Sequence, residues 1–586
     1  MTTDAGTITN CYYVNTQIGS PSNACTLSGY YQVFASEPTN RIYKQMTSSS
    51  QTYYAACNIS GVKSKYFTTG SPIDVAYTVT GVDGNVLTKG KDYEAVFSPT
   101  TTVQVANDYT LTITAKEGSG YTGSQTFTFS VTDFEAITSS TTSWEDGGIY
   151  KVTSNVTINN RIIVNGNVTL ILKDGFTLNA NKGIELTAGN QLTIKGENEN
   201  SGTLTCKADI HKSGIGAYRL GTLIINGGTI NATGGSYGAG IGGDIYSLGG
   251  TITINGGQIT ANGGYNAPGI GPGNPFSNAC YNPSGTVRLG WTNTTDFIQV
   301  TGNGADYGFG QRITDLGFVS GKGFTIDGTT NIATSSNIKG VYSIKLVPDA
   351  DVLNLANNAD NTAIASANST TKNVVLAGRT LYKDGKWNTI CLPFNVTLAG
   401  SPLAGADALT VTEASISEKT LNLTFGNAVT TLTAGTPYII KWDSGDDLTE
   451  TDLVFSNVTI NSAPNNFSSG SGDTKVSFMG TYGVTNYDAT DTSILLMGGG
   501  NTLYYPLSGA SIGACRAYFK IGGAQQARQL TSFNIDFGGV TEIVSANDMS
   551  DIIPADTWYT LDGRRLSGKP TVSGIYINNG NKVAIK

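Results

Sequence analysis

The chain is poor in charge and in histidine. Lys, Arg, Asp and Glu supply only 13% of its 586 residues, the net charge is −8, and one histidine is present. The positive residues form no cluster, which argues against binding to nucleic acid or to an anionic membrane surface. No apolar run reaches the ~18 residues of a membrane span, so we predict no membrane-spanning segment.

The single histidine limits the catalytic chemistry. A Ser-His-Asp or Cys-His arrangement would have to use His211, and neither a G-x-S-x-G motif nor a papain-like cysteine sequence accompanies it. Asp209 would share a face with His211 on a strand, but this pair supplies no nucleophile. We therefore predict a solvent-facing His211 beside Lys212, and we name no catalytic residue.

The seven cysteines are scattered without C-x-x-C spacing. With one histidine available, the sequence predicts no metal site and no cofactor. We interpret three cysteines as small buried apolar residues, namely Cys206, Cys391 and Cys515. One disulfide among Cys11, Cys25 and Cys57 is compatible with the spacing, and its pairing stays open.

Glycine, by contrast, occupies 74 positions, and Thr, Asn, Ser, Val, Ile and Tyr fill much of the remainder. These are residues typical of strands and turns, so we predict an all-β chain. A chain of this length exceeds a single hydrophobic core and predicts several domains.

Two segments are nearly identical. TLIINGGTINA at Thr222–Ala232 is followed 29 residues later by TITINGGQITA at Thr251–Ala261, and each precedes a Gly-Ile-Gly. A fixed period with alternating apolar residues predicts a right-handed parallel β-helix, a solenoid in which each coil stacks on the next at about 4.8 Å.

Alternation assigns faces within the two repeats. The apolar positions expected inside, stacked in pairs, are Leu223 on Ile252, Ile225 on Ile254, Ile230 on Ile259 and Ala232 on Ala261. Asn-Gly-Gly at 226–228 and 255–257 is expected to turn the corner, because glycine accepts a positive φ. Four asparagines are expected to build an internal ladder: Asn226, Asn231, Asn255 and Asn262.

The segments outside the repeat predict further β domains. The expected order is an irregular β segment at 1–65, an Ig-like β-sandwich at 66–133, the β-helix at 134–335, a β-sandwich at 336–545 and a sorting-like β tail at 546–586. The start lacks the basic and apolar parts of a signal peptide, so we expect that a leader was removed and Met1 added.

Several segments resemble families of Bacteroides-type extracellular proteins. SPIDVAYTVTGVDGNVLTKGKDYEAVF followed by NDYTLTITAKEGSGYTGSQTFTFSV resembles the bacterial Ig-like repeat of adhesins. WEDGGIY, LILKDGFTL, GTITINGGQITANGG and AGIGG, within 144–275, resemble a β-helical carbohydrate-binding module. The end, WYTLDGRRLSGKPTVSGIYINNGNKVAIK, resembles the tail of exported proteins. These resemblances imply an extracellular or cell-surface location.

Aromatic residues cluster in the loops between the repeat strands. Since Tyr237 and Tyr265 are 28 residues apart, nearly one repeat, we expect them to lie close together on neighbouring coils. Sugar rings stack on exposed aromatic faces. Aromatic side chains at these positions could also cap the core of the solenoid. The candidate ligand-binding residues are Tyr218, Tyr237, Tyr246, Tyr265 and Asp244. The expected partner is a glycan or another cell-surface molecule.

Parts of the sequence suggest three other functions. A polysaccharide lyase or glycoside hydrolase would use two loop carboxylates with a base, from the candidates Asp209, Asp244, Asp296 and Asp306 with Arg219 and Arg312. Ice binding through outward threonines is interrupted by Ile224 and Gln258. A phosphate loop at Gly234–Asp244 lacks the following helix and lysine, so its glycines are expected to serve the corners. The favoured function is a non-catalytic adhesin, glycan-binding protein or spacer.

Overall fold

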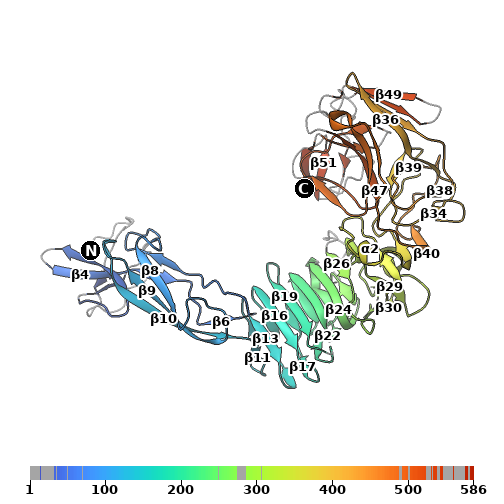
Figure 1. Cartoon of the computed structure of the whole chain (residues 1–586). Coiled ribbons are helices and arrows are strands. Elements are labelled where there is room, and N and C mark those ends of the chain that lie inside the picture. Colours follow the sequence, from blue (N-terminus) through green and yellow to red (C-terminus); the bar gives the residue numbers. More distant parts are fainter. Residues whose placement is uncertain are drawn as a thin grey trace. The chain divides into compact units, whose positions relative to one another are not determined.

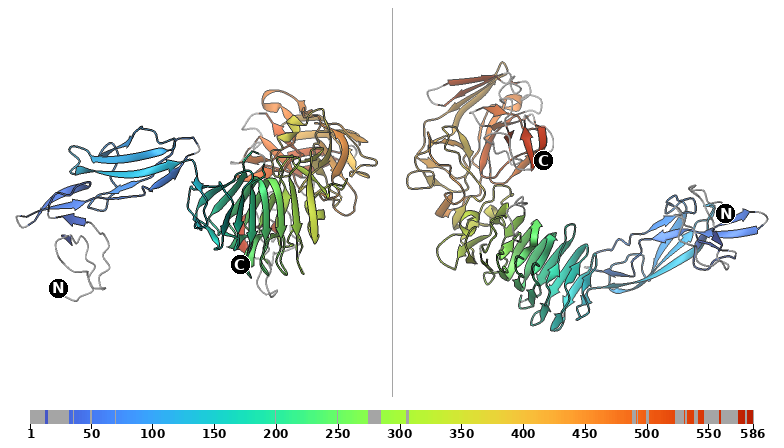
Figure 2. Two further views of the ribbon diagram at one scale, coloured as in Figure 1. Left: turned by 90° about the horizontal axis from the view of Figure 1, so that it is seen from below. Right: turned by 180° about the vertical axis from the view of Figure 1, so that it is seen from behind.

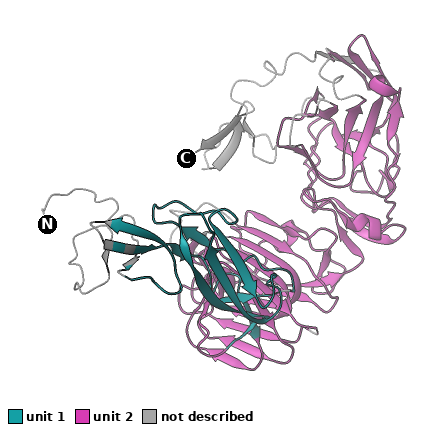
Figure 3. Cartoon of the chain, turned by 60° about the vertical axis from the view of Figure 1, so that its left-hand side comes forward, with its two compact units in different colours: residues 1–137, 145–151 teal, residues 138–144, 152–586 magenta. Residues whose placement is uncertain are grey.

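The computed structural model confirms the all-β prediction. It describes residues 13–14, 32–34, 36–48, 51–68, 70–198, 200–248, 250–273, 285–304, 307–487, 491, 493–498, 502–522, 530 and 532–537, and the backbone of 541–545, 558–559, 574–578 and 581–585. The helices within this part are short: α1 (Ser335–Ile338), α2 (Ala363–Ser366) and a 3-10 turn, η1 (Gly472–Thr474). None of them is long and apolar enough to cross a membrane. The chain divides into two compact units, 1–137 with 145–151, and 138–144 with 152–586 (Figure 3).

The first unit contains an antiparallel sheet. Its main strands are β3 (Ile42–Ser48), β4 (Gln51–Ala56), β8 (Tyr93–Ser98), β9 (Asn107–Ala115) and β10 (Thr122–Thr132). Alternate residues of β9, namely Tyr109, Leu111 and Ile113, are buried, as period two requires. The β3–β4 hairpin joins this sheet, because β3 pairs with β10. The boundary expected between residues 65 and 66 falls inside β6 (Lys65–Phe67), a strand of this sheet that pairs with β10.

Parallel strands dominate residues 156–318, which we call the ladder region (Figures 1 and 2). The first ladder comprises β16 (Asn167–Leu172), β19 (Gln191–Gly196), the first halves of β22 (Thr222–Thr233) and β24 (Thr251–Asn262), β26 (Thr286–Leu289) and β28 (Asp315–Phe318). The second comprises β14 (Val156–Ile158), β17 (Thr177–Ala180), β20 (Thr203–Lys207), the second halves of β22 and β24, and β27 (Phe297–Thr301). The third comprises β15 (Ile162–Val164), β18 (Ile184–Glu185), β21 (Ile215–Arg219), β23 (Ile241–Leu248) and β25 (Ile270–Gly271). From β15 to β25 the chain visits the ladders in rotation and advances by one strand at each visit.

The predicted stacking of the two repeats is confirmed. The four pairs of inward residues lie opposite one another in the β22–β24 register: Leu223 and Ile252, Ile225 and Ile254, Ile230 and Ile259, Ala232 and Ala261. All eight side chains are buried. Burial of one such leucine or isoleucine contributes about 1.5–3 kcal/mol, so apolar rows along the ladders stabilise this region.

Glycine permits the bend inside each repeat. Gly228 has φ +90° and Gly257 has φ +102°, conformations that side chains with a Cβ rarely adopt. The register of β22 and β24 shifts between Ile225 and Thr229, where the strand passes from the first ladder to the second. The predicted corner role of Asn-Gly-Gly is therefore confirmed.

Glycine is also required where successive loops touch. A Cβ built on Gly240 would lie 2.8 Å from the carbonyl oxygen of Gly269, and one on Gly214 would lie 2.6 Å from that of Gly240. Both contacts are with backbone, which has little freedom to move. Gly240, within Gly234–Asp244, therefore allows neighbouring coils to approach, a role that differs from the corner role predicted for this loop.

Antiparallel pairing ends the second ladder. Strand β30 (Ser343–Asp349) pairs with β27 and with β29 (Gly323–Ile326) in antiparallel fashion. Such pairing covers an edge that would otherwise be open to another chain. Because β30 lies beyond residue 335, this sheet extends past the boundary expected there.

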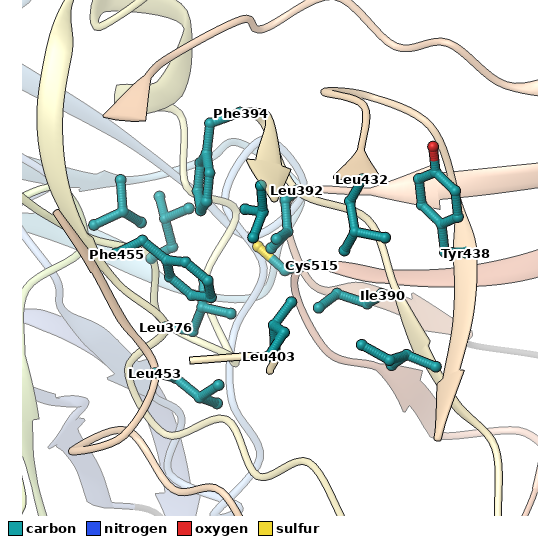
Figure 4. Packing of buried hydrophobic residues seen from close by; sticks show 14 of the residues in the cluster. Leu376, Ile390, Leu392, Phe394, Leu403, Leu432, Tyr438, Leu453, Phe455 and Cys515 are labelled. Carbon is teal, nitrogen blue, oxygen red and sulfur yellow. The ribbon is translucent and has the colours of Figure 1, made fainter. Parts of the chain in front are cut away.

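Residues 352–545 form several small sheets around two large apolar cores and two smaller apolar clusters. The longest sheets contain β36 (Val411–Ser417), β37 (Thr420–Phe425), β48 (Ser532–Asp536) and β49 (Thr541–Ser545), and β41 (Phe467–Ser469), β42 (Val476–Thr481), β47 (Arg516–Ile521), β44 (Ile494–Met497) and β45 (Leu503–Tyr504). In one core Phe394, Phe455 and Leu392 pack around the Cys515 thiol (Figure 4). We call 352–545 the C-terminal region.

The prediction that three cysteines are small buried residues is confirmed. Cys206, Cys391 and Cys515 are free and at most 2% exposed. Cys57 is also a buried free thiol, whereas Cys11 and Cys25 lie outside the described residues.

In the tail, β51 (Gly574–Asn578) and β52 (Asn581–Ile585) pair in antiparallel fashion, and residues 560–573 lie outside the described residues.

Candidate binding surface

Three aromatic side chains from successive coils lie in a row. The ring centroids of His211 and Tyr237 are 6.0 Å apart, and those of Tyr237 and Tyr265 are 5.9 Å apart at an interplanar angle of 89°. We call these three residues the aromatic row. The expected proximity of Tyr237 and Tyr265 is confirmed, and His211 extends the contact by one coil.

The backbone holds the aromatic row in place. The residues follow β20, β22 and β24, and the loops bond to one another: His211 N donates to Ser236 O at 2.9 Å, and Tyr237 N donates to Tyr265 O at 2.8 Å. His211 and Tyr237 have φ +68° and +67°. Left-handed conformations cost non-glycine residues about 1–2 kcal/mol. The tight loop-to-loop pairing therefore maintains a locally unfavourable backbone that aligns the two rings.

The aromatic row is accessible to solvent. Tyr265 is 56% exposed, His211 is exposed as predicted, and Tyr237 is partly buried between them. The neighbouring Ile210 is 70% exposed, which adds apolar surface beside His211. An exposed cluster of this kind is typical of a recognition surface rather than of a core.

Tyr246 and Tyr218 occupy the third ladder and its edge. The register of β21 and β23 passes from Ala217 opposite Gly243 to Arg219 opposite Leu248, so residues 244–247, which include Tyr246, form a bulge opposite Tyr218. Tyr218 is 56% exposed. The bulge reaches the aromatic row through its backbone, because Ile245 N donates to His211 O at 3.0 Å.

Asp244 lies inside the scaffold instead of facing solvent. It is 2% exposed, and its Oδ1 accepts hydrogen bonds from Ser213 N and Ser213 Oγ, both at 2.8 Å. Its Oδ2 lies 2.8 Å from Lys212 Nζ, and Arg161 Nη2 is 3.5 Å from Oδ1. These contacts do not fit a direct ligand contact, so we leave Asp244 out of the surface proposed below.

Arg161 is a structural residue that the sequence analysis did not identify. Its guanidinium donates from Nη1 to Ser213 O at 3.0 Å and from Nη2 to Gly216 O at 2.9 Å. Nε also lies 3.3 Å from Glu185 Oε2. One partly buried cation thus binds successive coils together and neutralises Asp244.

The other carboxylates that a glycosidase could use each bind their own local partners. Asp209 pairs with Lys182 at 3.4 Å, and Asp296 Oδ2 accepts from Thr292 N and Asn293 N, both at 2.9 Å. Asp306 lies outside the described residues. The described segment around His211 is a turn, so Asp209 and His211 do not share a strand face. Among the described residues, these contacts therefore bring no pair of acids together with a base.

Thiol and metal chemistry find no support in the described residues either. Burial raises the pKa of Cys206 and of Cys515 to about 12, so both thiols stay protonated and unreactive. No group of three or more His, Cys, Asp or Glu within the described ranges could hold a metal ion.

The asparagine ladder lies on the outside, which corrects the prediction of an internal one. Asn255 Nδ2 donates to Asn226 Oδ1 at 2.9 Å across the two repeats, and this contact is exposed. Asn181 Nδ2 donates to Asn159 Oδ1 at 2.7 Å in the same manner. The alternation sends these side chains outward, because the inward positions carry the apolar rows.

Comparison with known proteins adds no family: no family model, no curated protein and no solved structure matches the chain.

Proposed function

We propose that the ladder region is a right-handed parallel β-helix of a non-catalytic extracellular or cell-surface protein, and that it binds glycans through the aromatic row. The observation that carries this proposal is the contact of Tyr237 with His211 and Tyr265 across three coils, at 6.0 and 5.9 Å. The aromatic row contributes one ring from each of three successive coils. Such regular spacing suits a glycan, which is itself a chain of similar units.

The rotation among three parallel ladders supports the β-helix. Crossovers between parallel strands are right-handed in about 98% of cases, because a right-twisted strand returns to its sheet only in that sense. Each circuit of the chain from β15 to β25 connects parallel strands, so we expect its crossovers to be right-handed. The inward rows of leucine and isoleucine are the core that this architecture needs.

The exposed aromatic rings support a glycan as the ligand. Sugars present apolar C–H faces that stack on aromatic rings while their hydroxyls bond to polar neighbours. Tyr265 offers a half-exposed ring, and Tyr237 lies edge-on against it. The separate engagement of Asp209, Asp244 and Asp296 favours binding over hydrolysis.

The cell-surface location is supported by the resemblances alone. The Ig-like segment at 66–133 and the tail from Trp558 are similar to modules of exported proteins. A spacer role for the flanking domains follows from the same resemblance.

A glycan array followed by titration tests the proposal. The full chain should bind one or more plant or mucin polysaccharides without degrading them. Tyr237→Ala combined with Tyr265→Ala should weaken that binding at least about tenfold, because both stacking faces are lost. Tyr342→Ala is the matched control, since Tyr342 is 50% exposed and lies outside the row. Equal affinity for the double variant and the control would reject the aromatic row as the site.

A further inference from the structure

The C-terminal region contains a pocket of about 520 Å³. Its wall combines polar groups from Asn357, Thr380 and Ser511 with the rings of Tyr382 and Tyr504. Tyr382 is 42% exposed, so the pocket has a ring at the solvent. The volume and this mixture of ring faces and polar groups suit a small ligand with both apolar and hydrogen-bonding surfaces.

A buried cation lies behind this wall. Arg379 is only 2% exposed, and its Nη2 donates to Thr389 O at 2.6 Å. Its other two nitrogens, Nε and Nη1, are buried and have no hydrogen-bond partner within the described chain. Gly378, Thr380 and Thr389 all line the pocket, so the Arg379 guanidinium is held directly behind it.

A second cation lines the pocket itself. Arg516 donates from Nη2 to Asn357 Oδ1 at 3.2 Å, which is a neutral partner. Burial and the nearby Arg516 guanidinium lower the pKa of Arg379, and burial lowers that of Arg516. The structure thus holds two positive charges close together in a poorly solvated place.

No described carboxylate balances these two charges. Glu450 is adjacent, but its Oε2 accepts from Gly378 N at 2.7 Å and its Oε1 accepts from Ser336 N at 3.2 Å. None of the ion pairs found among the described residues includes Arg379 or Arg516. A buried unpaired cation is unfavourable, so an anion bound in the pocket would relieve a real cost.

We propose that this pocket binds a carboxylate-bearing sugar. Arg516 contacts the carboxylate, because a planar guanidinium matches a carboxylate with two parallel hydrogen bonds. Arg379 adds positive charge from behind the wall, and the sugar ring packs on Tyr382 and Tyr504 while its hydroxyls face Thr380 and Ser511. The site shares no residue with the aromatic row, so either proposal can fail alone.

Titration calorimetry of the full chain with sodium galacturonate and sodium glucuronate tests the assignment. At least one uronate should bind at least about tenfold more tightly than galactose or glucose, and should raise the melting temperature. Arg516→Met should remove this preference. The matched control is Arg288→Met, since Arg288 is paired with Asp315 in the ladder region. Tyr237→Ala with Tyr265→Ala should leave uronate binding unchanged.

Two further variants separate recognition from folding. Arg379→Met should weaken uronate binding and lower the melting temperature of the free protein less than Arg161→Met does, because it removes an unpaired buried charge along with a single hydrogen bond to Thr389 O. Arg516→Lys keeps the charge but loses the planar fork, so it should also bind less tightly. Equal binding of uronates and neutral sugars, or unchanged uronate binding in Arg516→Met, would overturn the proposal. A response to sulfate or phosphate but not to uronates would overturn the carboxylate assignment.

Discussion

Arg161 in the ladder region and Arg379 in the C-terminal region are both largely enclosed by protein, yet their surroundings differ. Arg161 donates to carbonyl oxygens of successive coils and is paired with the carboxylates of Glu185 and Asp244. Its Nε makes no hydrogen bond within the described chain but lies 3.3 Å from Glu185 Oε2, so the charge of Arg161 is balanced. Arg379 bonds to one carbonyl oxygen, and its Nε and Nη1 have no hydrogen-bond partner among the described residues. A buried charge that the scaffold satisfies is explained by folding alone. One that the scaffold leaves unsatisfied points to something outside the chain.

We expect the largest difference in stability between the two regions when a glycine is replaced by valine. Gly240→Val should destabilise the ladder region by about 4 kcal/mol, because its Cβ would meet the backbone of Asn262 and Gly269. Gly400→Val is the control in the C-terminal region, where φ is +77° and no atom lies within 4 Å of the built Cβ. It should cost only about 1–2 kcal/mol, from backbone strain. Urea denaturation followed by circular dichroism measures both, and equal costs would contradict the close stacking of the coils.

The next difference concerns the two arginines. Arg161→Met should cost about 2 kcal/mol, because Asp244 loses one cation and the carbonyl groups of Ser213 and Gly216 lose their donor. Arg379→Met should cost less in the same denaturation experiment, because it removes one hydrogen bond, to Thr389 O, together with an unpaired buried charge. If Arg379→Met were as damaging as Arg161→Met, Arg379 would be a structural residue and the comparison would fail.

The smallest expected effect concerns the outer asparagine ladder. Asn255→Ala should change stability by no more than about 0.5 kcal/mol, because the bond to Asn226 is exposed to water. Asn361→Ala in the C-terminal region should cost about 2 kcal/mol, since Asn361 is 2% exposed and bonds to the backbone of Ala356 and Tyr482. Thermal denaturation of the two variants side by side checks this order. A large loss in Asn255→Ala would mean that the outer ladder carries much of the stability.

The repeat explains which features were predictable. Two copies of one pattern, 29 residues apart, were enough to pair Ile225 with Ile254 and to bring Tyr237 near Tyr265. The place of His211 was missed although a signal existed. His211 precedes Tyr237 by 26 residues, which is also the offset between Thr203 and Thr229 where β20 pairs with β22. The preceding coil is shorter and its sequence is less similar, so the common period did not reveal it.

Contacts between dissimilar segments could not be predicted in the same way. Asp244 is buried by Arg161, 83 residues earlier, and by Ser213, and no pattern in the sequence relates them. Arg379 and Arg516 come together through sheets joined by irregular loops, so only the folded chain places both at one pocket. The asparagines were assigned to the wrong side because identical residues at a fixed period fit an internal or an external ladder equally well.

The register of the coils is the claim on which the aromatic row and the proposed β-helix both depend. Thr229 and Gln258 lie directly opposite each other on the outer face of β22 and β24. Their Cα atoms, one parallel-strand spacing of about 4.8 Å apart, lie within the range of Cα separations that a disulfide spans. Thr229→Cys with Gln258→Cys should therefore form an intramolecular disulfide nearly completely under mild oxidation, as measured by mass spectrometry. Thr229→Cys with Thr260→Cys, two residues out of register, should form far less; equal or reversed yields would contradict the stacked coils.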